Sequence, residues 1–264
     1  MKISLSIIVL LCVTVCSAQA AKLYTEDFES YKTDATLHGQ GNWNAGTKPK
    51  VIQGVGFNTT KVVSNGDIDG VAMKAITLNW GSQPKGSLSF DTYSDATTKT
   101  VGYVGIGRGG TNSLGFYMNG ASITFRPGSA AGVQTAMTDV SGTQTSLTVG
   151  KWYNITANFT LADNTITDVW LTNLTDGGPA VQLYFGAATA THVYTTEAGD
   201  ESTWDTVTLR LPPSTGSVRM IDNIELSGND YMMVGGVSID RDILWACSSP
   251  QGAYKNLGVF TSLD

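Results

Sequence analysis

The chain has 264 residues and a formal charge of −6. Only 14% of its residues are charged, and 30 are glycines. This acidic balance, without clusters of Lys and Arg, disfavours binding to nucleic acid or to an anionic membrane surface. Two histidines are too few for a His-rich zinc site, and the sequence contains no P-loop or dinucleotide-binding fingerprint.

The first twenty residues have the pattern of a secretory signal peptide. Lys2 gives a positive start, residues 3–15 form an apolar run too short to span a bilayer, and Ala18-Gln19-Ala20 fits the small-x-small cleavage rule. We expect cleavage after Ala20 and a secreted protein, extracellular or periplasmic, with no membrane-spanning segment. Cys247 would then be the one remaining cysteine, which rules out an intrachain disulfide.

The rest of the sequence predicts an all-β, two-sheet antiparallel sandwich over residues 21–228. Strand-like runs alternate with turn signals, and no stretch keeps a helical apolar period over three turns. Residues 26–31 and 220–226 both alternate apolar with acidic side chains, so we expect two strands that pair and close the domain. Residues 229–264 form a C-terminal tail to which the sequence assigns no role.

One hairpin is specified by Asn119-Gly120, which lies between the alternating runs 114–118 and 121–126. The alternation predicts that Phe116, Met118, Ile123 and Phe125 face the core. It also predicts that Tyr117, Thr124 and Arg126 face the other side.

Four short motifs resemble the concanavalin A-like, laminin-G-like jelly-roll domains of exported bacterial proteins. The motifs are Glu26-Asp27-Phe28-Glu29-Ser30-Tyr31, Leu37-His38-Gly39-Gln40-Gly41-Asn42-Trp43, Gly150-Lys151-Trp152-Tyr153-Asn154-Ile155 and Ile221-Asp222-Asn223-Ile224-Glu225-Leu226. The resemblance implies a jelly roll of two curved antiparallel sheets. Lectins, carbohydrate-binding modules, glycoside hydrolases, polysaccharide lyases and adhesion domains share this fold, so the fold does not decide the function.

The same resemblance implies a structural Ca²⁺ where the first strand meets the last. Ca²⁺ takes about six to eight oxygen ligands, mostly carboxylates and carbonyls. The matching positions are Glu29 and Asp222, with Asp27 as a further ligand. The alternative is an acidic edge that prevents strand pairing with another chain.

Three other residues are candidates for contact with a poly- or oligosaccharide. Tyr117 and Arg126 share one face of the predicted hairpin, and Trp80 follows a predicted strand. An aromatic platform supplies contact area for a sugar ring, while a bidentate Arg fixes its orientation. The alternative for each of these side chains is ordinary packing.

Catalysis has weaker signals in this sequence. No E-x-D-x-x-E pattern of the kind used by jelly-roll glucanases is present. A lyase would need a base, a proton donor and a cation, for which His192, Tyr194 and Arg126 are the candidates. We therefore expect an exported, non-catalytic β-sandwich that binds carbohydrate or another extracellular surface. The alternatives are a polysaccharide-degrading lyase or glycoside hydrolase, and a structural matrix or surface protein.

Overall fold

The computed structural model describes residues 22–45, 49–65, 71–76, 85–97, 101–108, 111–126, 134–160, 163–193, 204–211, 217–228, 231–234 and 237–240. All regular elements in these ranges are strands, which confirms the predicted all-β class. No helix in this part of the chain is long and apolar enough to cross a bilayer. The predicted signal peptide, Trp80, Tyr194 and Cys247 lie outside the described residues.

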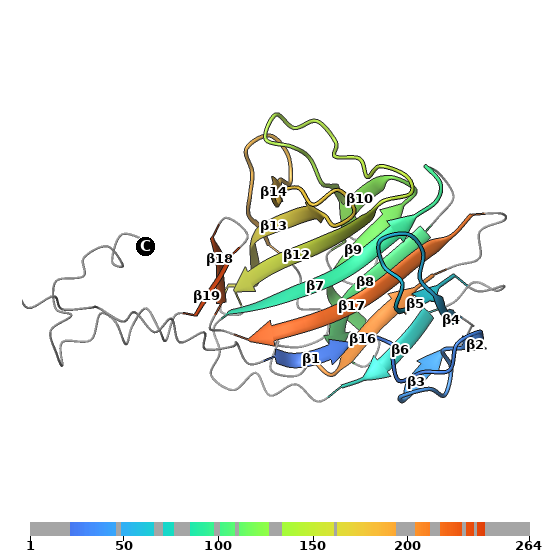
Figure 1. Cartoon of the computed structure of the whole chain (residues 1–264). Coiled ribbons are helices and arrows are strands. Elements are labelled where there is room, and N and C mark those ends of the chain that lie inside the picture. Colours follow the sequence, from blue (N-terminus) through green and yellow to red (C-terminus); the bar gives the residue numbers. More distant parts are fainter. Residues whose placement is uncertain are drawn as a thin grey trace, which may run out of the picture.

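A ten-stranded sheet forms the layer nearer the viewer in Figure 1. Its central path is β14 (Val181–Leu183), β13 (Thr165–Asn173), β12 (Trp152–Thr160), β7 (Lys85–Ser94), β17 (Arg219–Gly228), β5 (Lys61–Ser64), β4 (Lys50–Gln53) and β2 (Ala35–Thr36). Two short strands join it from the side: β1 (Lys22–Glu26) pairs with β17, and β15 (His192–Val193) pairs with β13.

A seven-stranded sheet packs behind the first one and completes the sandwich (Figure 1). Its order is β11 (Thr135–Ala136), β10 (Ser122–Phe125), β9 (Thr111–Asn119), β8 (Val101–Arg108), β16 (Thr206–Arg210), β6 (Val71–Ala75) and β3 (Trp43–Ala45). A separate hairpin of β18 (Tyr231–Val234) and β19 (Val237–Asp240) lies within the C-terminal tail.

Side-chain alternation along the strands builds the core between the two sheets. In the β9–β10 hairpin, Phe116, Met118, Ile123 and Phe125 are all fully buried, as the sequence predicts. The turn differs by one residue from the expected Asn119-Gly120. Ser122 pairs with Asn119, so the loop is residues 120–121, with a positive φ of 58° at its first residue. This is the position where a type II′ turn requires glycine.

A first strand pairs with the closing strand, but it lies before most of the predicted segment, residues 26–31, and shares only Glu26 with it. Strand β1 ends at Glu26, and the chain then turns through Phe28, whose φ is 56°. The expected strand over residues 26–31 is therefore wrong beyond its first residue. The predicted facing of the side chains is nevertheless confirmed, because Phe28 is fully buried, whereas Asp27 and Glu29 are exposed. The amide N–H of Phe28 donates to the Glu26 carboxylate at 3.3 Å, which stabilises this tight turn.

Candidate functional site

A change of partner along β17 creates the candidate site. Strand β17 pairs with β5 as far as Ile221 and with β1 from Ile224 onward. Its register against β7 shifts at the same point, and Asn223 between them has a φ of 48°. Asparagine tolerates this left-handed conformation better than most residues. The bulge therefore leaves a gap on one side of β17, between the end of β1 and the start of β5.

The loop that joins β4 to β5 forms one wall of this gap. The N–H of Gly54 donates to the Thr60 carbonyl at 2.8 Å, which closes the loop at its base. The indole N–H of Trp152 donates to the Val55 carbonyl at 2.7 Å, which fixes its first half. Phe57 lies on this loop with 59% of its surface exposed, and it is the largest exposed hydrophobic side chain among the described residues.

Two asparagine side chains at the base of the gap are oriented by buried carboxylates. Asn58 donates its amide N–H to Asp222 Oδ2 at 2.7 Å, and Asn223 donates to Asp91 Oδ2 at 2.8 Å. Asn154 of β12 donates to the other oxygen of Asp91 at 2.8 Å. Each amide therefore points one N–H at an acid, and its remaining polar groups are held in a defined direction.

Asp91 and Asp222 are direct neighbours on adjacent strands of the sheet. Burial raises the pKa of Asp91, and it raises the pKa of Asp222 to about 7. Hydrogen bonds from Asn58 and Thr60 oppose this rise at Asp222, while the nearby charge of Asp91 adds to it. Asp222 is fully buried, and its Oδ1 atom accepts no hydrogen bond. Asp91 borders the gap, whereas Asp222 lies behind Asn58 and Thr60.

The opposite wall consists of the turn that follows β1. Asp27 Oδ1 accepts the backbone N–H of Glu29 at 3.1 Å, and Glu29 Oε1 accepts the backbone N–H of Lys61 at 2.6 Å. The ammonium group of Lys61 returns to the turn and donates to the carbonyls of Glu29 and Tyr31, at 2.7 and 2.9 Å. These bonds hold the turn against the first residue of β5.

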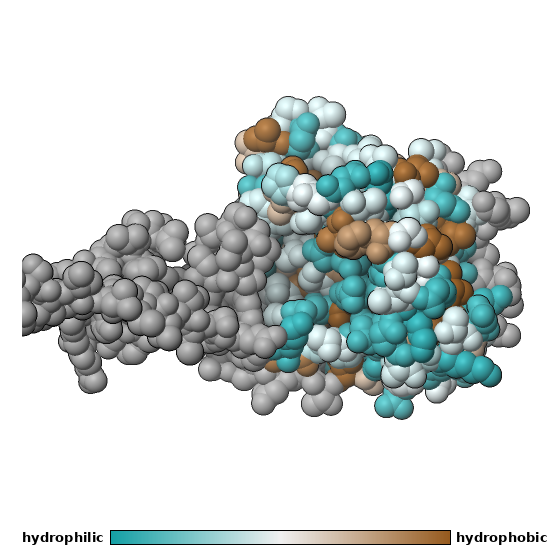
Figure 2. Space-filling model, viewed as in Figure 1, coloured by the Kyte–Doolittle hydropathy of each residue, from teal (hydrophilic) through white to brown (hydrophobic). Residues whose placement is uncertain are grey.

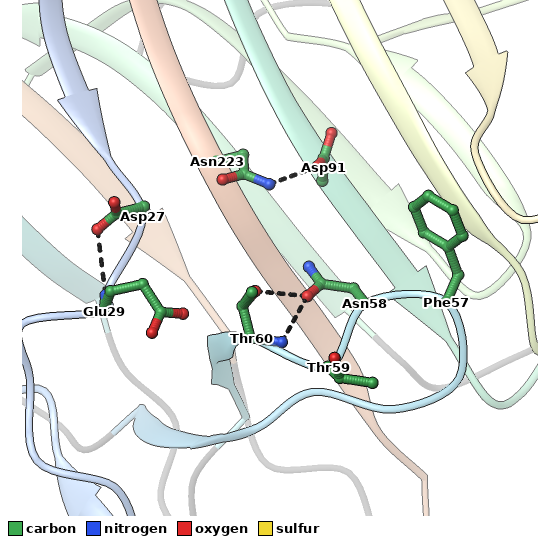
Figure 3. Close-up of a pocket in the computed structure, with 8 residues that line it drawn as sticks. All are labelled: Asp27, Glu29, Phe57, Asn58, Thr59, Thr60, Asp91 and Asn223. Atoms are coloured by element: carbon green, nitrogen blue, oxygen red, sulfur yellow. Dashed lines mark hydrogen bonds between the residues drawn. The ribbon is translucent and has the colours of Figure 1, made fainter.

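The gap is a cavity of about 370 Å³, and a second cavity of about 270 Å³ adjoins it. Phe57 lies on one side of the first cavity, and Asp27 and Glu29 lie on the other (Figure 3). The surface over β1 and β17 is mainly hydrophilic, with a narrow hydrophobic band beside it (Figure 2). The first cavity is lined by Asp27, Glu29, Phe57, Asn58, Thr59, Thr60, Asp91 and Asn223.

A buried carboxylate fixes β1 beside these cavities. Glu26 Oε2 accepts hydrogen bonds from Tyr31 at 2.7 Å, Trp43 at 3.1 Å and Tyr24 at 3.2 Å. Its counter-ion is Lys74, at 2.5 Å. Burial acts to lower the pKa of Lys74, but the hydrogen bonds to Glu26 and Tyr31 leave it above its ordinary value. Lys74 belongs to β6, so this ion pair joins the two sheets near the site.

The structure places Tyr117 and Arg126 on the other sheet, away from this cavity. Tyr117 pairs with Thr124, and the N–H of Arg126 donates to the Gly115 carbonyl at 2.9 Å. This register puts both side chains on the outer face of the seven-stranded sheet, as the alternation predicts. Both are half-buried. Their contact with a sugar stays a prediction, and Trp80 lies outside the described residues.

His192 packs in an aromatic cluster. Its ring stacks on Phe185 with 4.9 Å between ring centroids and meets the edge of Phe125 at 5.4 Å. Burial lowers the pKa of His192. Phe125 faces the core and Arg126 follows it on the outer face, so β10 separates the histidine from that cation. Tyr194 lies outside the described residues, and the predicted lyase arrangement is not tested.

The three predicted metal ligands lie near the start of β5. Asp27 and Glu29 line the first cavity, and Asp222 accepts a hydrogen bond from the Thr60 hydroxyl at 3.1 Å. Among the described residues, no three His, Cys, Asp or Glu side chains are close enough together to hold a metal ion. The three acidic side chains are therefore near one another, but they do not form a complete set of Ca²⁺ ligands.

Sequence reasoning did not single out Phe57, Asn58, Asp91 or Asn223 as site residues. Of these, Asn223 lies within the closing motif, residues 221–226. The available signal was a large apolar side chain directly after Gly56, in a short polar loop between two short strands. Nothing in the sequence indicates that β17 changes partner next to that loop.

Comparisons with known proteins give structural similarity alone. No family model and no curated protein matches the sequence. Lectin II from Ulex europaeus is 10% identical, with 79% of this chain and 100% of the lectin covered and a TM-score of 0.51. Winged bean acidic lectin complexed with methyl-α-D-galactose is 8% identical, with 78% and 98% covered and a TM-score of 0.51.

A sialidase is 12% identical, with a TM-score of 0.49; the match covers 88% of this chain and only 21% of the sialidase. At such low identities these likenesses concern the fold. Together with the two antiparallel sheets, the lectin similarities confirm the predicted concanavalin A-like jelly roll.

Proposed function

We propose that this chain is an exported, non-catalytic β-sandwich that binds carbohydrate in the cavity beside Phe57. The observation that carries the proposal is the exposed Phe57 ring at the border of a cavity of about 370 Å³. A sugar ring presents an apolar C–H face and a rim of hydroxyl groups. An aromatic side chain supplies area for that face, and a few fixed polar groups orient the rim.

The polar groups of the cavity suit hydroxyl ligands. Asn223 uses one amide N–H on Asp91, so its carbonyl oxygen and second N–H remain for a ligand. Asp91 accepts one hydrogen bond at each carboxylate oxygen and has further acceptor capacity. A hydroxyl group both donates and accepts, and it can therefore bind to this pair. The similar winged bean lectin structure contains a galactoside, which supports a sugar ligand for this fold.

A polysaccharide-degrading enzyme is the alternative on the same fold. Glycoside hydrolysis needs two carboxyl groups that flank one bond, commonly with one raised pKa. Of the two carboxyls here whose pKa burial raises, Asp91 borders the cavity and Asp222 is buried behind it. Asp27 and Glu29 also border the cavity, but each already accepts a backbone N–H that holds the turn, which favours binding over catalysis. A structural matrix or surface protein is the third possibility, and it assigns no ligand to the cavity beside Phe57.

A glycan array combined with a polysaccharide-digestion assay on the full chain tests the proposal. We expect binding to at least one glycan class without new reducing ends or unsaturated products. Phe57→Ala should abolish the array signal, whereas Val140→Ala, which removes a side chain that is 60% exposed on another loop, should retain it. Released products would favour the enzyme, and equal signals from the two variants would exclude this cavity.

We also propose that Asp222 contributes to a structural Ca²⁺ site with Glu29 and Asp27. The fit of the residues is partial. Asp222 Oδ1 is a buried acceptor that receives no hydrogen bond, which suits a cation ligand. Glu29 and Asp27, however, already accept backbone N–H groups. If the proposal holds, chelator lowers the melting temperature of the wild type and leaves that of Asp222→Asn unchanged.

Export is the remaining part of the proposal, and it depends on residues 1–20. Expression in a secreting host should give a mature chain whose first residue is Ala21. N-terminal sequencing of the secreted protein checks this expectation. A secreted product that still begins at Met1 would contradict it.

A further inference from the structure

The two cavities on this face are neighbours, and together they are called the trough. The cavity beside Phe57 and the smaller one beside β1 share Asp27 and Asn223 in their linings. The smaller cavity extends along the paired ends of β1 and β17, through Thr25 and Glu225. A ligand that fills the first cavity and continues past Asn223 therefore enters the second. This continuity suits a linear oligosaccharide better than a single sugar.

The described lining of this trough is strongly acidic in the first of its two cavities, the one that Phe57 borders. Asp27, Glu29 and Asp91 line the first cavity, and none of its eight described lining residues is a lysine or arginine. Lys61 is close by, but its ammonium group is directed at two backbone carbonyls. An anionic sugar in this cavity would lie beside three carboxylates, and the N–H groups of the Lys61 ammonium already donate to backbone carbonyls.

The smaller cavity is closer to neutral, because two of its three acids, Glu26 and Glu225, form ion pairs. Lys22 forms an ion pair with Glu225 at 2.8 Å, and Lys74 neutralises Glu26 at 2.5 Å. Asp27, shared by both cavities, has no such ion pair among the described contacts. The excess negative charge is therefore concentrated between Asp27 and Asp91, at the point where the two cavities join.

From this charge distribution, and on the basis of the proposed function, we infer that the trough binds a linear oligosaccharide with free amino groups. A protonated amine on a sugar ring carries a positive charge, which is the sign that the carboxylates of Asp27 and Asp91 attract. Its three N–H groups suit carboxylate and amide oxygens. A neutral glycan of the same shape binds more weakly. A uronate polymer is repelled, because each sugar brings a further carboxylate to an acidic surface.

Matched tetrasaccharides test this inference by isothermal titration calorimetry on the full chain, with chelator present, because Ca²⁺ bound at Asp27 and Glu29 would compensate part of the same charge. Tetramers of β-1,4-linked glucose, glucosamine and glucuronic acid share one backbone and differ in charge. At pH 6 and low salt we expect the glucosamine tetramer to bind about tenfold more tightly than the glucose tetramer, since each exposed charge pair changes affinity by a few fold. The glucuronate tetramer should give no measurable heat. A rise in salt should reduce the preference.

A matched pair of variants assigns the preference to this trough. Asp27→Asn keeps the oxygen that accepts the Glu29 N–H but removes the charge, and it should lower the ratio of glucosamine to glucose affinity by a few fold. Asp163→Asn removes the same charge from the exposed turn between β12 and β13 and should leave the ratio unchanged. Equal ratios in both variants would place the preference elsewhere.

The outcomes separate this inference from the proposed function. Equal or tighter binding of the glucose or glucuronate tetramer overturns the inference, and so does failure of all three tetramers when the glycan array detects another sugar. In both cases carbohydrate binding stands. If the array is also blank, or if Phe57→Ala retains the full array signal, the proposed function of this cavity fails as well.

Discussion

The buried carboxylate of Asp222 offers the sharpest test of the physical account of this site. Asp222→Asn replaces an ionisable group with a neutral one of nearly the same shape. The Asn side-chain oxygen can keep the hydrogen bonds that Oδ2 now accepts from Asn58 at 2.7 Å and from Thr60 at 3.1 Å. The new amide group takes the place of Oδ1, which accepts no hydrogen bond.

The magnitude follows from the pKa of Asp222, which burial raises from 3.8 to about 7. Below pH 3.8 the carboxyl group is protonated in both states. As the pH rises toward 7, the folded state binds more protons than the unfolded state, so the free energy of unfolding falls. The difference of about 3 pH units corresponds to about 4 kcal/mol. An unsatisfied buried amide costs about 1–3 kcal/mol, which leaves a net gain of about 1–3 kcal/mol for the Asn variant at pH 8.

Guanidinium unfolding at pH 4, 6 and 8, in the presence of chelator, measures this difference. At pH 4 we expect the Asn variant to be no more stable than the wild type, and at pH 8 we expect it to be more stable. Asp91 contributes a pH dependence of the same sign to both proteins, because burial raises its pKa too. A variant that is less stable at every pH, or a difference that does not change with pH, would refute the reasoning. Added Ca²⁺ should stabilise only the wild type if the proposed metal site exists.

Two further substitutions test the packing of the sandwich, both by guanidinium unfolding. Lys74→Met leaves the Glu26 carboxylate buried with its three neutral donors, and it should cost about 2–4 kcal/mol. Lys151→Met removes an exposed ion pair with Asp176 and should change stability little; comparable losses would contradict the importance of burial. Gly115→Ala places a Cβ atom 2.1 Å from the hydroxyl group of buried Tyr103, and it should cost about 1–3 kcal/mol. Gly178→Ala, which meets no atom within 4 Å, is its control, and equal stability of the two alanine variants would contradict the close packing of Tyr103.

Much of the fold could be predicted from the local alternation of apolar and polar residues. The core side chains of the β9–β10 hairpin follow strict alternation, so their sidedness was fixed even though the turn differs by one residue. The pairing of the first strand with the last was also predicted, but from the alternation in residues 26–31, of which only Glu26 lies in β1. The end of β1 was not, because alternation cannot reveal that Phe28 adopts a positive φ.

The candidate site was harder to predict, because it depends on contacts distant in sequence. Asp91 and Asn223 are on different strands and meet only when β7 and β17 pair. Phe57 reaches them because β17 exchanges β5 for β1 at the bulge. No periodicity of the sequence encodes that exchange. The predicted pair Tyr117 and Arg126 does share a face, as alternation requires, but that face belongs to the other sheet.

Hydrogen exchange with and without the glycan that the array identifies tests the central claim most directly. The account predicts slower exchange in peptides that cover the loop 54–60 and residues 222–226, which border the trough. It predicts no change over residues 115–126, where Tyr117 and Arg126 lie. Protection confined to residues 115–126 would move the binding site to the other sheet and contradict the account.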